Sequence, residues 1–149
     1  MSTPALHLPL SLFDNVTADP QNLFESMWYL IEASEEDEPD GFTLDSAGVA
    51  VDSGFAVAIP DKGVTLPKHP AFARSVLRQW TTLAVNDSAE SVGPDDIPAH
   101  RCFGGWKPHD VWMIEPTLVF LDKSDAIIYG SVWNQDSIYH LDKGEVIEL

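Results

Sequence analysis

The side chains with the most recognisable chemistry lie close together near position 100. His100 and Cys102 are separated by one residue, and His109-Asp110 follows a few residues later. Imidazole, thiolate and carboxylate groups all bind zinc, and four such ligands close a structural zinc site. A His-x-Cys pair is tighter than the ligand spacing of common zinc fingers, and the chain has no second cysteine. The four residues are metal candidates that spacing alone does not establish, and we predict neither a bound metal nor another cofactor.

Cys102 is also the one thiol that could act as a nucleophile, with His100, His109 or His140 as its base. The sequence around it matches no cysteine hydrolase pattern, and a free cysteine beside Phe103 is typically a small buried hydrophobic residue. Phosphate-binding loops, Gly-x-Ser-x-Gly elbows and His-Glu-x-x-His motifs are absent from the sequence. We therefore predict no catalytic residues. A small hydrolase or metalloprotein centred on His100, Cys102 and His109 remains an alternative.

A run of acidic residues is the most distinctive local feature of the sequence. Six of the nine residues from position 32 to position 40 are acidic: Glu32, Glu35, Glu36, Asp37, Glu38 and Asp40. Their mutual repulsion disfavours a helix C-terminus, so we expect an exposed loop. The run is either a solvated linker or a binding site for the basic surface of a partner protein.

The acidity extends over the whole chain. The 149 residues include 24 Asp and Glu but only 8 Lys and Arg, for a net charge of −16, and no Lys or Arg precedes Lys62. Such a field repels nucleic acid phosphates and anionic lipids, so we predict no direct nucleic acid or membrane binding. A basic protein surface is the expected partner. One alternative is a DNA mimic that inhibits a host restriction or defence nuclease, and another is acidity that serves only solubility.

No apolar run is long enough to cross a bilayer, because Asp, Pro or Gly interrupts each one. The first ten residues have no basic start and no continuous apolar centre, so they do not read as a secretory signal. A single cysteine makes no internal disulfide. These features together predict a cytoplasmic protein.

Three helices are expected, over residues 20–34, 70–86 and 123–134. Asp19-Pro20 supplies a cap followed by proline at the first helical position, and Asp122 can cap the third helix. Apolar residues recur at helical spacing in all three segments. The tryptophans are expected in the core: Trp28, Trp80 and Trp133 on the apolar helix faces, and Trp106 and Trp112 covering the core elsewhere.

Short alternating or apolar runs predict the strands, and most of the links between them end in glycine. The expected strands are Phe42 to Asp45, Gly48 to Asp52, Phe55 to Ile59, Val64 to Leu66, Val111 to Glu115, Leu118 to Leu121, Ser137 to Leu141 and Glu145 to Leu149. We expect the first four to form a meander, Pro116 to interrupt the next two, and the last two to form a hairpin. Residues 87–101 read as a surface loop and Gly104-Gly105 as a turn. The prediction is one α+β domain over residues 16–149, with a mostly antiparallel sheet and about three helices, preceded by a flexible arm over 1–15.

Several short motifs from position 54 onward carry a resemblance to a known group of proteins. They are Gly54 to Pro60, Leu66-Pro67, Gly104-Gly105-Trp106, Val119-Phe120, Asn134-Gln135, Ser137 to Leu141 and Gly144 to Ile147. Over roughly residues 54–149 the chain resembles small accessory proteins carried by bacteriophages, plasmids and other mobile elements. The resemblance implies no catalytic residues, and this chain departs from it with His140 where that group usually has Asp. The sequence thus favours a non-enzymatic, acidic protein-interaction module encoded by a mobile element.

Overall fold

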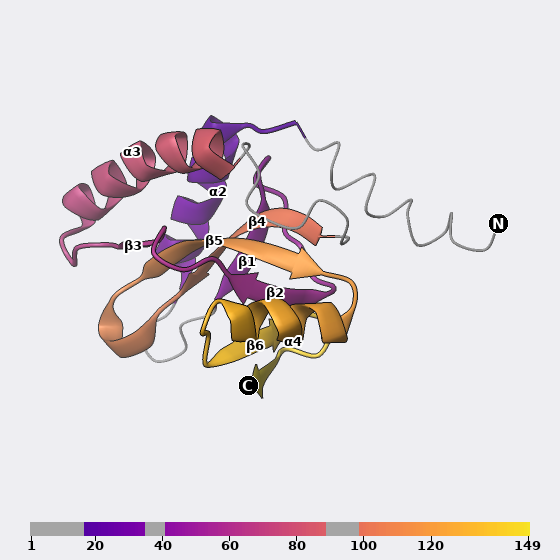
Figure 1. Cartoon of the computed structure of the whole chain (residues 1–149). Coiled ribbons are helices and arrows are strands. Elements are labelled where there is room, and N and C mark those ends of the chain that lie inside the picture. Colours follow the sequence, from indigo (N-terminus) through magenta and orange to yellow (C-terminus); the bar gives the residue numbers. More distant parts are fainter. Residues whose placement is uncertain (1–16, 35–40, 89–98) are drawn as a thin grey trace.

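Figure 1 traces the computed structural model of the chain, which describes residues 17–34, 41–88 and 99–149. The predicted N-terminal arm over 1–15 lies outside these residues, as do Glu35 to Asp40. The predicted helices are present as α2 (Pro20–Ala33), α3 (Pro70–Ser88) and α4 (Lys123–Val132). The Asp19 carboxylate caps α2 by accepting a hydrogen bond from the Asn22 amide at 3.0 Å. Asp122 caps α4 in the same way, since its carboxylate accepts a bond from the Ser124 amide at 2.7 Å.

Within the described ranges, seven strands form one antiparallel sheet, which confirms the predicted α+β class. The strands are β1 (Phe42–Asp45), β2 (Phe55–Ala58), β3 (Val64–Thr65), β4 (Ala99–Trp106), β5 (Met113–Phe120), β6 (Ser137–His140) and β7 (Glu145–Glu148). Their order across the sheet is β1-β4-β5-β2-β6-β7, with β3 paired to β5. The predicted C-terminal hairpin is β6 and β7, and Gly144 takes the positive φ of 63° that its turn requires.

The predicted meander of the first four strands is wrong. β1 pairs with β4, β2 with β5 and β6, and β3 with β5, so beyond the contact of β1 with the segment that follows it, the early strands pair with later ones. The segment from Gly48 to Asp52 is not a strand and contributes one bridge, from Ala50 to Leu44. Alternation along a chain identifies a strand but not its partner, because the partner is decided by which apolar faces meet in the core.

The central strands β4 and β5 are the largest departure from the prediction. Gly104 and Gly105, read as a turn, lie within β4, where a Cβ on Gly105 would collide with the Phe42 ring of the neighbouring strand. Pro116, expected to interrupt a strand, lies inside β5. It is tolerated because β2 ends at Ala58, beside the position where the proline lacks an N–H. In β4 and β5, therefore, the glycines and the proline allow the neighbouring strands to pack closely, and they do not end the strand that contains them.

The helices cover one face of the sheet. Directly paired residues and their second neighbours along a strand share a face, and this rule places Leu44, Val57, Phe103, Ile114 and Leu118 on the same side. α2 and α3 lie side by side and bury the part of this face near β1 (Figure 1). α4 packs on the part formed by β2, β5 and β6. The opposite face carries a smaller buried cluster that includes Ala56, Cys102 and Val119.

Several apolar residues of α3 and α4 point to solvent. Phe72 and Leu83 of α3 are 66% and 70% exposed, while the core side of that helix holds Ala73, Leu77, Thr81 and Val85. In α4 the buried residues are Ala126 and Gly130, and Ile127, Ile128 and Val132 are exposed. Both helices are more apolar than their buried faces require, so the helical pattern alone could not choose which apolar residues are buried.

The tryptophans are less buried than the sequence predicted. Trp28, Trp80 and Trp133 are half-buried at the margins of the two helix-covered clusters. Trp112 is buried as expected, but Trp106 at the end of β4 is half exposed, and its indole N–H donates to the Glu115 carboxylate at 3.0 Å.

None of the helices in the described ranges is both long and apolar enough to cross a membrane.

Candidate functional site

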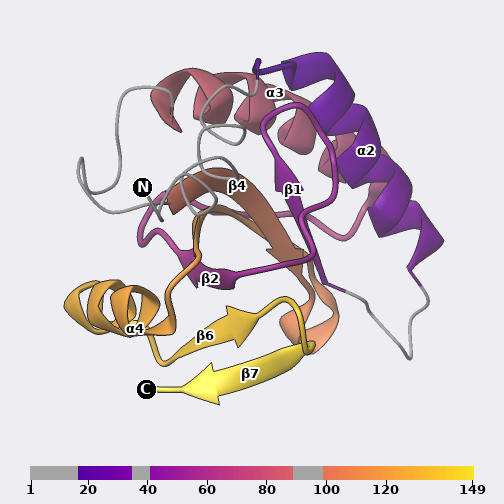
Figure 2. The same ribbon diagram turned by 90° about the vertical axis from the view of Figure 1, so that its right-hand side faces the viewer.

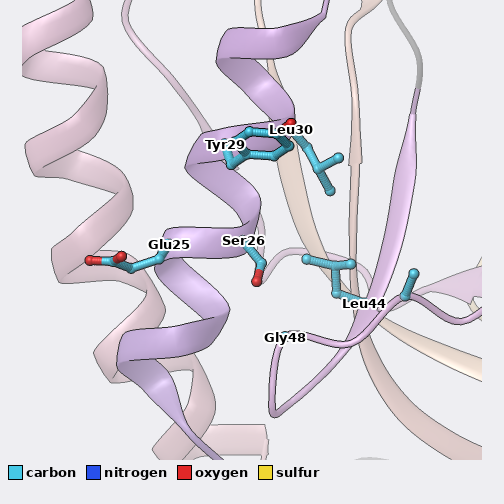
Figure 3. Close-up of a pocket in the computed structure, with 7 residues that line it drawn as sticks. Glu25, Ser26, Tyr29, Leu30, Leu44 and Gly48 are labelled. Atoms are coloured by element: carbon cyan, nitrogen blue, oxygen red, sulfur yellow. The ribbon is translucent and has the colours of Figure 1, made fainter.

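A groove runs between helix α2 and the turn that follows strand β1, and Figure 3 shows its lining. It has a volume of about 360 Å³ and opens to solvent. Its lining residues are Glu25, Ser26, Tyr29, Leu30, Leu44, Gly48 and Ala50. Leu30 projects from the helix toward β1, and Leu44 projects from β1 toward the helix (Figure 3). The groove therefore has an apolar floor and a polar rim contributed by α2.

The turn that forms one wall of the groove is fixed by its own hydrogen bonds. One oxygen of the Asp45 carboxylate accepts bonds from the amides of Ala47 and Val49, at 2.9 and 3.0 Å. The Asn22 side chain of α2 donates to the Ala47 carbonyl at 2.6 Å, which ties the turn to the helix. Gly48 has a φ of 88°, and a Cβ there would lie 2.9 Å from the Asn22 carbonyl oxygen. The wall is thus formed before any ligand binds.

The exposed face of α2 carries one aromatic residue and two acidic residues. Glu25, Tyr29 and Glu32 follow one another at helical spacings of four and three residues, so they share one face of the helix. Tyr29 is 70% exposed, although it lies at the rim of an apolar groove. The Glu25 carboxylate accepts a bond from the Gln21 side chain at 2.8 Å, which orients it on this surface. Carboxylates that share a helix face with an exposed ring are suited to a lysine or arginine side chain.

The acidic run predicted as a partner site begins at this face. Glu32 lies exposed in the last turn of α2. The other five candidates, Glu35, Glu36, Asp37, Glu38 and Asp40, lie outside the described residues. Sequence reasoning did not identify Tyr29 or the groove. The spacing of Glu25, Tyr29 and Glu32 was a signal that could have drawn attention to Tyr29, but the groove's other wall is formed by a turn about twenty residues later.

His100 and Cys102, the predicted chemical pair, are both buried in β4, on the face of the sheet away from the helices. Asp45 pairs with Cys102 across the β1–β4 ladder. Burial raises the pKa of the Cys102 thiol well above its usual value, and the negative charge of Asp45 raises it further. The thiol therefore stays protonated at neutral pH, which is the opposite of what an activated nucleophile needs.

The structure separates the remaining candidates from this pair. Asp110 is exposed in a short 3₁₀ helix, η1 (Pro108–Asp110), which links β4 to β5. Cys102 lies four residues before the end of β4, roughly 13 Å along the strand. The side chain of His109 is not among those described. Within the described part of the chain, no three His, Cys, Asp or Glu side chains gather closely enough to hold a metal ion.

His140, the other possible base, belongs to a different part of the sheet. It lies on β6, three strands from Cys102, a separation of roughly 14 Å at ordinary strand spacing. Its ring stacks on Phe55 with centroids 4.3 Å apart, and its Nε2 is 3.3 Å from a carboxylate oxygen of Asp142. A direct Cys102–His140 pair is therefore excluded by the fold.

No known family model, curated protein or solved structure matches this chain. The groove and the exposed face of α2 are the surface features of the described residues best suited to binding.

Proposed function

We propose that this protein is a non-enzymatic, acidic interaction module that binds a basic segment of a partner protein at the groove beside α2. The observation that carries the proposal is the exposed Tyr29 ring at the rim of an apolar groove, on the same helix face as Glu25 and Glu32. Large exposed rings beside an apolar hollow are characteristic of binding surfaces.

No Lys or Arg precedes Lys62 in the sequence. The cations that approach α2 come from α3, where the Arg74 and Arg78 guanidinium groups lie 5.2 and 4.7 Å from the centroid of the Phe24 ring.

The bound segment has a defined chemistry in this proposal. A lysine or arginine lies over Tyr29 and pairs with Glu25 or Glu32, and a neighbouring apolar side chain enters the groove over Leu30 and Leu44. Each exposed ion pair contributes up to about 1 kcal/mol, and a cation on an exposed ring contributes about 0.5–1 kcal/mol. The preformed turn limits the entropy lost on binding. The result is a moderate, salt-sensitive affinity.

The acidic run from Glu35 to Asp40 has a supporting role in the proposal. It follows directly on the binding face of α2 and adds long-range attraction for a basic surface. An aromatic ring beside carboxylates suits a peptide side chain better than it imitates a row of phosphates, so we place a protein segment ahead of DNA mimicry. The resemblance to mobile-element accessory proteins suggests a host protein as the partner, met in the cytoplasm.

The test compares three immobilised proteins as baits in a host lysate. The first is the wild type, and the second combines Glu25→Gln, Tyr29→Ala and Glu32→Gln. The third, Asp61→Asn with Asp136→Asn, removes the same number of charges from exposed positions that do not line the groove. We expect a partner that the wild type and the third protein retain and the second loses. Retention of the same partner by all three would refute the groove as the binding site.

A further inference from the structure

The two edges of the sheet differ in how their backbone groups are used. The edge formed by β1 is closed by the chain itself, because the Asp45 amide donates to the Val49 carbonyl at 2.8 Å and the Val51 amide donates to the Thr43 carbonyl at 2.9 Å. At the other edge, among the strands of the described residues, β7 pairs with β6 alone. Figure 2 shows β7 as the outermost strand, with no other described element beside it.

The register identifies which groups of β7 point away from the sheet. The Leu149 amide donates to the Asp136 carbonyl at 3.0 Å, so this pair is joined by hydrogen bonds. Hydrogen-bonded and non-bonded pairs alternate along an antiparallel ladder. Ile147 and Glu145 therefore bond inward to β6, and the N–H and C=O groups of Val146 and Glu148 point outward. These two donors and two acceptors form a template for one more strand.

The side chains of β7 specify what that strand must carry. Glu145 and Glu148 are exposed at the two ends of the strand, and Val146 between them is 62% exposed. Val146 shares its face with Tyr139, which is 41% exposed, and Ile147 lies half-buried against the α4 cluster. Opposite charges and apolar residues are the pairs that stabilise neighbouring strands. The antiparallel strand that complements Glu-Val-Ile-Glu therefore has a basic residue at each end and two apolar residues between them.

A second copy of this chain is the poorer occupant. Each copy carries a net charge of −16, and pairing two β7 strands would bring Glu145 and Glu148 of both copies into one short seam. Acidic side chains on an edge strand discourage self-pairing. The same carboxylates favour a basic strand, so the charge selects between the two occupants.

From these observations we propose that β7 binds an extended basic segment of a partner protein, which adds to the sheet as an eighth strand. The segment has the pattern basic-apolar-apolar-basic and makes backbone hydrogen bonds to Val146 and Glu148. This site lies at the opposite end of the strand order from the groove beside β1, and it stands independently of the proposed function.

The experiment titrates the isotope-labelled full chain with a capped Thr-Lys-Val-Val-Lys-Thr peptide at low salt and follows the backbone amide signals by NMR. We expect the largest shifts at the amides of Val146 and Glu148, and binding that weakens as salt is added. A peptide with Glu in place of both Lys residues is the matched ligand control and should not bind.

Two variants of the protein separate backbone pairing from charge. Val146→Pro removes an outward N–H and no bond to β6, so it should abolish binding while the β6–β7 hairpin remains. Glu145→Gln with Glu148→Gln changes only exposed side chains and should weaken binding roughly tenfold. Glu25→Gln with Glu32→Gln removes the same charge from α2 and should leave the shifts at Val146 and Glu148 unchanged, because these amides lie at the other end of the strand order.

Three results would overturn the proposal. The first is an absence of shifts along β7 at a peptide concentration that saturates any binding. The second is a set of shifts confined to the groove beside α2 and abolished by its Gln variant, with none at Val146 or Glu148. The third is a dimer of the unliganded chain, seen by sedimentation, that Val146→Pro dissociates.

Discussion

The buried pair on β4 and the exposed face of α2 reverse the roles that residue types alone would assign them. His100 and Cys102 carry the most reactive groups in the sequence, but both are 2% exposed and the pKa of the thiol is raised by burial. Tyr29, Glu25 and Glu32 are ordinary surface residue types, but the helix presents them together beside a groove. Accessibility, rather than intrinsic reactivity, separates a residue that maintains the fold from one available to a partner.

The largest contrast between the two regions should appear in stability. Phe103 follows Cys102 in β4, is fully buried, and meets the Trp80 ring edge-on with centroids 6.0 Å apart. Phe103→Ala should lower the free energy of unfolding by about 3–5 kcal/mol, because it removes a large core ring. Tyr29→Ala should change it by about 0.5 kcal/mol or less, as surface substitutions do. Denaturant unfolding of both variants measures this, and a loss above about 1 kcal/mol for Tyr29→Ala would make that ring structural.

The next effect concerns the turn that forms the wall of the groove. Gly48→Ala places a side chain at a φ of 88° and against the Asn22 carbonyl. We expect a loss of about 1–3 kcal/mol in unfolding free energy, the range for strained backbone positions, and weaker partner binding. Thermal unfolding and a binding titration test both. Unchanged binding in a destabilised variant would show that the wall of the groove is not used.

The burial of Cys102 should make the stability of the protein depend on pH. A raised folded-state pKa means that the folded chain holds the thiol proton more tightly than the unfolded chain, whose cysteine titrates near about 8.5. The associated stability is fully present below that pH and is lost as pH rises above it, until the folded pKa is reached. Urea unfolding at about pH 7 and pH 9.5 should therefore show a steeper loss for the wild type than for Cys102→Ala. An equal loss in both proteins would mean that the thiol is not buried as described.

The function of Cys102 gives a separate test. Cys102→Ser buries a hydroxyl group and should cost about 1–3 kcal/mol of stability. It should leave partner binding intact, because the side chain does not reach the surface. Binding is measured at a temperature where the variant is shown to be folded. Loss of binding with an intact fold would restore Cys102 as a functional residue.

The smallest structural effect is expected from the acidic run. Changing Glu35, Glu36, Asp37 and Glu38 together to Gln or Asn should barely alter folding, and it should slow association with a basic partner at low salt. Salt screens such attraction over about 10 Å at 0.1 M, so wild type and variant should converge as salt rises, with dissociation changing less. Stopped-flow association rates across a salt series decide this. Equal rates at low salt would make the run a solubilising segment only.

The sequence predicted correctly those features that depend on residues close together in the chain, and it failed for features that depend on distant residues. Asp19 and Asp122 act on amides within three residues, so both helix starts were predictable. The role of Gly105 depends on the Phe42 ring of another strand, so β4 was mistaken for a loop and a turn. The groove has the same character: it exists only because the turn after β1 packs on α2. Tyr29 could be read from the sequence as exposed or buried, and only the fold decides.

The most direct test of the central claim is to map where the basic segment of the captured partner meets this protein. The isotope-labelled chain is titrated with that segment, and the amide signals of the wild type are compared with those of Tyr29→Ala. The account predicts shifts at Glu25, Tyr29, Glu32 and Gly48, little change at His100 and Cys102, and binding weakened roughly tenfold by Tyr29→Ala, as expected where an exposed ring anchors the contact. Shifts centred on the β4 pair, or binding that Tyr29→Ala leaves unchanged, would contradict it.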